Sequence, residues 1–327
     1  MKAFDIRLRG AGGEPVDLTR TITSHGLASL PPLEIDEGAG TLTTTVSVPG
    51  GRPRTVRVSP GSDGQARVEV MGPPPGRRGA QALAATIRHV LHMDEDLSGF
   101  YALAAEDREL AWVTRGAGRM IRSPTVFEEV VRIVCTTNCS WALTTKMITT
   151  LVERLGEAAP GAPPDGWRDR AFPTPEAMAA ATPRFYRDVV RAGYRGPYLR
   201  SLARSVASGA LDLESLGRAT VDEVSDDEVE AELLALPGVG PYAAAHIMLL
   251  LGRYSRLILD AWTRPTYARL RGRRKIVPDA TIVRRFRPYG RFAGLAFWCY
   301  VTRDWVDDHE PRLEALTLGR KAAKEVE

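Results

Sequence analysis

The sequence predicts an α+β protein in which an N-terminal antiparallel β subdomain precedes a larger all-helical region. Short runs of alternating residues, separated by Gly and Pro, are typical of antiparallel hairpins. Such runs lie at residues 41–48, 55–58 and 66–70. Helical periodicity takes over from about residue 79. We therefore expect a β-rich subdomain over 1–115 and a helical region over 116–320.

The helical region is marked by apolar residues at helical spacing. Phe127, Val130, Val131 and Val134 fall at i, i+3, i+4 and i+7, which places them on one face of a helix. A Pro-rich stretch at 159–175 then predicts a surface loop between helices. The second half of the chain is therefore expected to be a bundle of helices with a long connection inside it.

Composition excludes several classes of protein. The 327-residue chain is 44% hydrophobic and 26% charged, as is ordinary for soluble globular proteins. It has no run of about 18 apolar residues that would span a membrane, and residues 1–5 lack the apolar region of a secretory signal. Its three cysteines favour a reducing compartment and are too few for an iron–sulfur cluster. We expect a monomer in the cytoplasm, nucleoid-associated if the source is bacterial.

Positive charge is concentrated near the C-terminal end of the chain. The net charge is only +4, but nine cations stand against one acid, Asp279, between residues 269 and 291. The nine are Arg269, Arg271, Arg273, Arg274, Lys275, Arg284, Arg285, Arg287 and Arg291. Such a cluster suits a polyanionic partner. A solvated arginine-rich face is an equally good reading of the cluster alone.

A helical hairpin is predicted over 226–252. Residues 225–228, Ser-Asp-Asp-Glu, form a capping box that opens its first helix. The turn is Leu-Pro-Gly-Val-Gly at 236–240, and a second helix begins near Tyr242. Two glycines here leave backbone N–H groups free at a helix N-terminus, where a phosphate can bind. The alternative is an ordinary helical hairpin with a Gly cap.

Asp260 is the candidate catalytic carboxylate. It directly follows the apolar triplet 257–259, so we expect it to be desolvated, which destabilises a protein unless something compensates. A helix N-cap is the alternative reading, because a helical pattern follows over 261–270. Both readings can hold together, with the cap orienting the carboxylate.

The turn at 236–240 followed by Asp260 resembles the helix-hairpin-helix (HhH-GPD) superfamily of DNA glycosylases. Residues 122–138 and 192–198 are similar to the corresponding parts of eukaryotic-type 8-oxoguanine DNA glycosylase. The resemblance extends from about residue 90 to 305. Before that it is only architectural, since this family and the inducible 3-methyladenine DNA glycosylase II of bacteria also carry a β subdomain. It implies that Asp260 catalyses removal of a damaged base from double-stranded DNA.

The resemblance also implies residues that contact the opened DNA. A base must be flipped out of the duplex before it can be excised. In the family, an asparagine and a Tyr-Arg pair fill the gap and contact the orphaned base, and Asn138, Tyr194 and Arg195 match them. Taken singly, these residues would be assigned to a local cap, packing and a surface charge.

Three further residues are implied to form the base pocket. Tyr242 and Trp298 match aromatic positions that hold the flipped base, and His246 lies one turn beyond Tyr242 on the same helix face. Tyr242 could stack on an electron-poor alkylated base through a cation–π contact. Core packing remains the alternative for Trp298 and His246.

The hairpin is implied to bind a monovalent cation, Na+ or K+. By the match, the main-chain carbonyls of Leu234, Leu236 and Val239 would hold it, and Gly238 and Gly240 would supply N–H groups to a phosphate. The cation would add positive charge where the phosphate binds. No cofactor is expected for the catalytic step itself.

Tyr242 is the main departure from the pattern. Bifunctional members carry a lysine there, which attacks the sugar and cleaves the strand through a Schiff base. Tyrosine cannot form that imine, whereas Asp260 can stabilise an oxocarbenium-like sugar and help a water molecule to attack. We therefore predict a monofunctional glycosylase acting on an alkylated purine. The alternatives are excision of 8-oxoguanine and a non-catalytic protein that binds damaged DNA.

Overall fold

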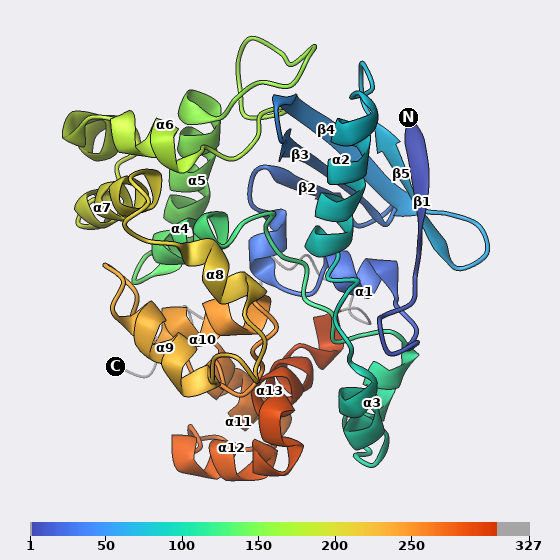
Figure 1. Cartoon of the computed structure of the whole chain (residues 1–327). Helices are drawn as coiled ribbons and strands as arrows, with labels where there is room; N and C mark the ends of the chain where they lie inside the picture. The colour runs from blue at the N-terminus through green and yellow to red at the C-terminus, as the bar shows by residue number, and fades with distance from the viewer. Residues whose placement is uncertain (1, 306–327) are drawn as a thin grey trace.

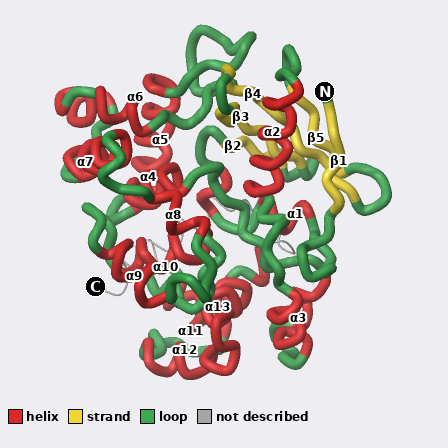
Figure 2. Tube along the Cα trace, in the orientation of Figure 1, coloured by secondary structure: helices red, strands yellow, loops and turns green. Residues whose placement is uncertain are grey.

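A computed structural model describes residues 2–305 and confirms the predicted α+β architecture. Five antiparallel strands form one sheet in the order β1-β5-β4-β3-β2. The strands are β1 (Ala3–Arg7), β2 (Leu33–Asp36), β3 (Thr41–Val48), β4 (Gly51–Pro60) and β5 (Gln65–Val70). Figure 2 shows that they gather on one side of the molecule while helices make up most of the rest.

The helices follow mainly after the sheet. They are α1 (Leu18–Ile22), α2 (Arg77–Val90), α3 (Ser98–Ala105), α4 (Val126–Thr136), α5 (Trp141–Leu155), α6 (Pro175–Ala180), α7 (Arg195–Ala207), α8 (Leu213–Arg218), α9 (Asp226–Leu234), α10 (Pro241–Leu250), α11 (Thr263–Leu270), α12 (Asp279–Phe286) and α13 (Ala293–Val301). Shorter helical segments are η1 (Gly26–Ser29), η2 (Ala111–Arg115), η3 (Phe185–Val189), η4 (Arg287–Phe292) and η5 (Arg303–Trp305). Helices α1, α2 and α3 lie within residues 1–115, which were predicted to be β-rich.

One face of the sheet packs against α2 (Figure 1). Alternate residues such as Val46, Val56 and Val68 point to this face, where they meet Leu83 and Ile87 of α2. This arrangement follows from the period of two in a strand, which sends successive side chains to opposite faces. The sheet and α2 therefore share one apolar core.

A second core lies among the helices and includes α10 and α13. Residues 243–250 of α10 and every residue of α13 are buried, as expected for helices that are apolar on all sides. Helix α4 contacts α5, α7, α8 and α10. These helices therefore lie at the centre of the helical core.

Polar contacts join the two parts of the chain. Buried Arg132 of α4 donates hydrogen bonds to the carbonyl oxygens of Leu27 and Leu30. The indole N–H of Trp298 in α13 donates to the carbonyl oxygen of Ser24 at 2.9 Å. The N-terminal part therefore holds the side chain of Trp298, which the resemblance assigns to the base pocket.

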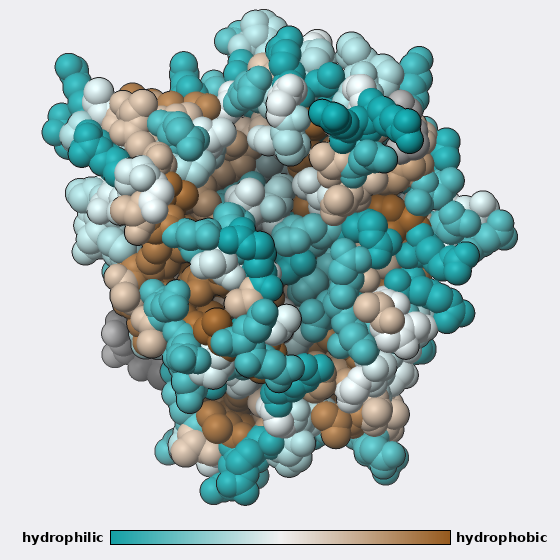
Figure 3. Space-filling view, in the orientation of Figure 1, coloured by the Kyte–Doolittle hydropathy of each residue, from teal (hydrophilic) through white to brown (hydrophobic). Residues whose placement is uncertain are grey.

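None of the helices within residues 2–305 combines the length and the apolar composition needed to cross a bilayer. On the face drawn in Figure 3, hydrophilic side chains cover most of the surface and hydrophobic ones show in patches between them.

Candidate active site

The predicted hairpin consists of α9, a short turn and α10. The Ser225 hydroxyl accepts the Glu228 N–H, and the Glu228 carboxylate accepts the Ser225 N–H at 2.8 Å, which confirms the capping box. Gly238 has a φ of +83°, and a Cβ there would lie 2.9 Å from the ring of Tyr198. The turn therefore requires glycine at this position.

Gly240 stands at the N-cap of α10 for a different reason. Its φ of −107° is ordinary, and a Cβ added to it would meet no atom within 4 Å. The backbone at the start of α10 is thus open to an approaching group. Open backbone at a helix N-terminus is the geometry that binds phosphate.

The three predicted cation ligands lie along the same turn. Leu234 ends α9, and Leu236 and Val239 are buried in the turn. The Leu236 carbonyl accepts the Val239 N–H at 3.1 Å, which leaves its second lone pair available. Among the described residues, no backbone N–H donates to the carbonyls of Leu234 or Val239. These three carbonyl oxygens therefore keep free lone pairs.

Asp260 is held by a reciprocal cap at the entrance to α11. Its Oδ1 accepts the N–H groups of Trp262 at 2.9 Å and Thr263 at 2.6 Å. Its own N–H donates to the Thr263 hydroxyl at 2.9 Å, and that hydroxyl donates to the Ile258 carbonyl. Asp260 therefore caps the turn that enters α11, whose own N-cap residue is Trp262, and these bonds fix the orientation of the carboxylate.

Aromatic rings stack edge to face beside this aspartate. The centroids of Tyr242 and His246 are 5.4 Å apart, and those of His246 and Trp298 are 5.5 Å apart. Trp262 adds a further contact to Trp298 at 6.0 Å. The three predicted pocket residues therefore lie together, with Trp298 and His246 buried.

Burial sets the protonation of this cluster. Desolvation lowers the pKa of His246 to about 4, and the negative charge of Asp260 opposes this shift. Desolvation also raises the pKa of Tyr242 to about 12, with the neighbouring Thr136 side chain opposing this shift and the charge of Asp260 adding to it. Both residues are therefore neutral near pH 7. The Nδ1 atom of His246 is buried without a hydrogen-bond partner in residues 2–305.

The predicted DNA-contacting residues meet at the turn between α4 and α5. Asn138 is exposed at its tip, with a φ of +45°. The Thr137 carbonyl accepts hydrogen bonds from the Tyr194 hydroxyl, at 3.3 Å, and from the Arg195 guanidinium. That guanidinium also lies 4.4 Å from the centroid of the Tyr194 ring.

Arg195 is not a surface charge, because only 4% of it is exposed. The side chain of the adjoining residue, Thr136, lies near Tyr242, whose pKa it lowers, and its hydroxyl donates to the Ile133 carbonyl oxygen. Residues 136–138 thus run from the aromatic cluster to the group formed by Asn138, Tyr194 and Arg195.

The sequence is similar to that of curated DNA glycosylases, although no family model matches the chain. It is 26% identical to a probable N-glycosylase/DNA lyase of Methanothermobacter thermautotrophicus over 235 residues, 65% of this chain and 72% of that protein. It is also 26% identical to the DNA-3-methyladenine glycosylase of Bacillus subtilis over 159 residues, 48% of this chain and half of that protein.

Solved structures extend the likeness to nearly the whole chain. The 3-methyladenine DNA-glycosylase of Archaeoglobus fulgidus superposes with a TM-score of 0.69 at 21% identity, over 91% of this chain and 98% of that one. The 8-oxoguanine glycosylase/lyase of Clostridium acetobutylicum gives 0.69 at 20% identity, over 92% and 96%. The chain has the fold of the helix-hairpin-helix DNA glycosylases. The suspected resemblance is confirmed.

Within this glycosylase fold, sequence reasoning missed Trp262, Thr263 and Thr137. A signal for Thr263 was available, since it stands three residues after Asp260 at the spacing of a capping box. The Thr137 carbonyl carried no local signal, because its partner Arg195 is 58 residues away in the chain.

Proposed function

We propose that this chain is a DNA glycosylase of base excision repair that flips an alkylated purine out of double-stranded DNA and hydrolyses its glycosidic bond. The observation that carries the proposal is the placement of Asp260. Its Oδ1 is held by two backbone N–H groups, and its charge acts on both Tyr242 and His246. A fixed carboxylate beside neutral aromatic groups suits a reaction that develops positive charge on a sugar.

Asp260 would act through its second oxygen. No hydrogen bond within residues 2–305 reaches Oδ2, whereas Oδ1 is saturated by Trp262 and Thr263. As the glycosidic bond breaks, the sugar becomes oxocarbenium-like, and a preorganised negative charge stabilises it. The same carboxylate can take a proton from the attacking water. The product is a free base and an abasic site.

The residue at the family's lysine position favours hydrolysis over strand cleavage. Tyr242 has no amine, so it cannot form a Schiff base. Lys146 on α5 and Lys275 after α11 are both exposed, and neither matches the motif. We therefore propose that the enzyme is monofunctional.

The remaining predicted residues would hold the DNA. Gly238 and Gly240 would present backbone N–H groups to a phosphate, and a Na+ or K+ ion on the hairpin carbonyls would add positive charge there. Asn138 would enter the gap left by the flipped base. Tyr194 and Arg195 stand directly behind it on the Thr137 carbonyl.

Excision of 8-oxoguanine is the second candidate function. The grouping of Asn138, Tyr194 and Arg195 around one carbonyl favours it, because these residues carry the similarity to 8-oxoguanine glycosylases. The neutral aromatic cluster of Tyr242, His246 and Trp298 favours an alkylated base, whose positive charge can stack on aromatic rings.

Base release from parallel duplexes decides between these functions. One duplex would carry an alkylated purine and the other 8-oxoguanine, and each would be incubated with wild type and Asp260→Asn. The asparagine keeps an oxygen for the Trp262 and Thr263 N–H groups, so the fold is preserved. Release of the alkylated base by wild type alone supports the proposal. Binding that distinguishes damaged DNA, with no release of either base, would make the chain a lesion-binding protein instead.

A further inference from the structure

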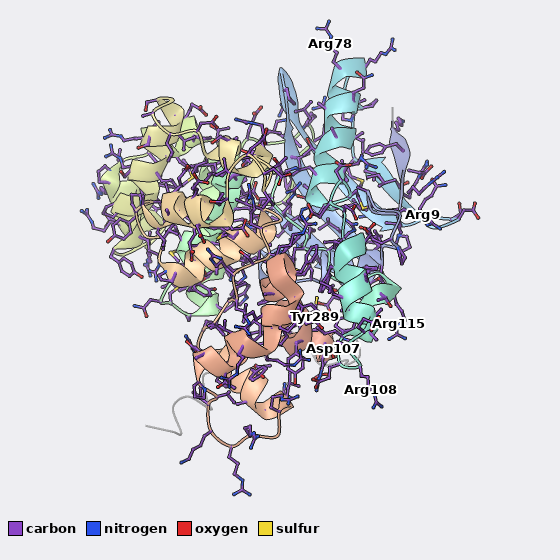
Figure 4. The ribbon with its side chains drawn as sticks, turned by 60° about the horizontal axis from the view of Figure 1, so that its bottom comes forward. Arg9, Arg78, Asp107, Arg108, Arg115 and Tyr289 are labelled. Atoms are coloured by element: carbon purple, nitrogen blue, oxygen red, sulfur yellow. The ribbon has the colours of Figure 1, made fainter. Side chains whose placement is uncertain are left out.

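Acidic residues neutralise part of the cluster of cations at 269–291. Arg285 pairs with Asp107 at 2.5 Å, and Arg271 pairs with Glu109 at 3.3 Å. The Tyr289 hydroxyl also donates to Asp107, at 2.7 Å. Figure 4 shows Asp107 and Tyr289 close together, where the segment after α3 meets η4. Arg271 and Arg285 are thus neutralised within the protein and serve packing, whereas four other arginines of the cluster are exposed and pair with no carboxylate within residues 2–305: Arg269, Arg284, Arg287 and Arg291.

The loop between α11 and α12 is not neutralised. Arg273, Arg274 and Lys275 are exposed there, and no carboxylate within residues 2–305 pairs with any of them. They line a hollow of about 600 Å³ together with Tyr267 and Thr281. Three adjacent unpaired cations repel one another, so the site is electrostatically suited to an anionic ligand.

The loop is one short helix away from the candidate catalytic carboxylate. Helix α11 starts three residues after Asp260 and has eight residues, so at 1.5 Å per residue it is about 12 Å long. DNA rises 3.4 Å per base pair, so this distance corresponds to about four base pairs. A duplex with one nucleotide at Asp260 has phosphates at that range.

We propose that Arg273, Arg274 and Lys275 form a second DNA contact that binds the phosphodiester backbone a few base pairs from the flipped nucleotide. The inference rests on the proposed function for the position of the DNA. Phosphate contacts position a protein without reading bases, so the loop supplies affinity and no lesion specificity. An acidic protein is the competing partner, because Ile276 beside the cations is 61% exposed.

The test is the salt dependence of binding to an undamaged duplex. The triple variant Arg273→Ala, Arg274→Ala, Lys275→Ala removes three contacts. We expect the slope of log K against log salt to fall by about 2.7, since each phosphate contact contributes about 0.9. A matched triple, Arg9→Ala, Arg78→Ala, Arg115→Ala, changes the net charge equally. These three arginines lie on the N-terminal part of the molecule, away from α11 and α12 (Figure 4), and should leave the slope unchanged.

Two outcomes overturn the proposal. If the loop variant keeps the wild-type slope, the loop does not contact DNA and an acidic protein becomes the partner to test. If both triples lower the slope equally, the effect belongs to net charge. Because undamaged DNA is used, the result does not depend on excision. Base release at saturating enzyme, measured separately, should be the same for the loop variant and wild type, and its absence from both would contradict only the proposed function.

Discussion

The two ends of α11 differ in burial and in charge. At its start, Asp260 adjoins a cluster of neutral, buried side chains, and only 7% of His246 is exposed. Beyond its end, Arg273, Arg274 and Lys275 are exposed and charged. Desolvation governs the first region and net charge governs the second. The difference implies that the chemistry and the general affinity for DNA are carried by separate groups, which can be altered independently.

The largest effect is expected for Asp260→Asn, at the start of α11. Loss of a preorganised charge at a transition state lowers a rate by about 10²–10³-fold, so we expect base release to fall by that factor. Affinity for undamaged DNA should not change, because the amide oxygen preserves the cap of α11. Single-turnover base release and a binding titration measure the two quantities. A variant that lost affinity and rate together would show that the two regions are not separable.

The pH dependence of stability tests whether the pocket is desolvated. Burial lowers the folded-state pKa of His246 from 6.5 to about 4, so between these values the unfolded chain binds a proton that the folded chain does not. The free energy of unfolding therefore decreases as the pH falls through this window, by about 2 kcal/mol between pH 7 and pH 5. Urea unfolding of wild type and His246→Gln at both pH values measures it.

Between pH 7 and pH 5, the free energy of unfolding of His246→Gln should fall by about 2 kcal/mol less than that of wild type. His89 and His92 also have lowered pKa values through burial, but both proteins share them. Identical pH profiles would mean that His246 titrates normally and that the pocket is wet.

An effect of similar size is expected at the hairpin. Gly240→Leu places a side chain where phosphate would approach, and hydrogen bonds to charged groups contribute about 1.5–3 kcal/mol, so affinity should fall by about tenfold or more. The loss should be equal for intact and damaged duplexes. Gly76→Leu is the matched control, because Gly76 also caps a helix and has open space at Cβ. Loss of lesion discrimination alone would contradict the phosphate role.

The sequence predicts the interior of the sheet better than its edges. Strands β3, β4 and β5 coincide with the three alternating runs, whereas β1 and β2 were not predicted. These two are the edge strands and have five and four residues. So short a segment contains too few alternations to stand out from a loop.

In the site, local features were predictable and long-range contacts were not. The capping box at Ser225 and the cap at Asp260 depend on residues three apart, so spacing reveals them. The burial of Arg195 depends on a carbonyl 58 residues away, and its exposure could not be inferred from the neighbouring residues. The position of Asp260 beside Tyr242 likewise required the packed helices.

The central claim is that Asp260 drives excision without a lysine, and borohydride trapping tests it most directly. Wild type would be incubated, with borohydride present, with a duplex that carries the lesion found to be excised. The strands would then be analysed before and after alkali. We predict no covalent enzyme–DNA adduct, with strand breaks only after alkali, because Tyr242 cannot form an imine. An adduct trapped through any residue, or breaks before alkali, would contradict the account.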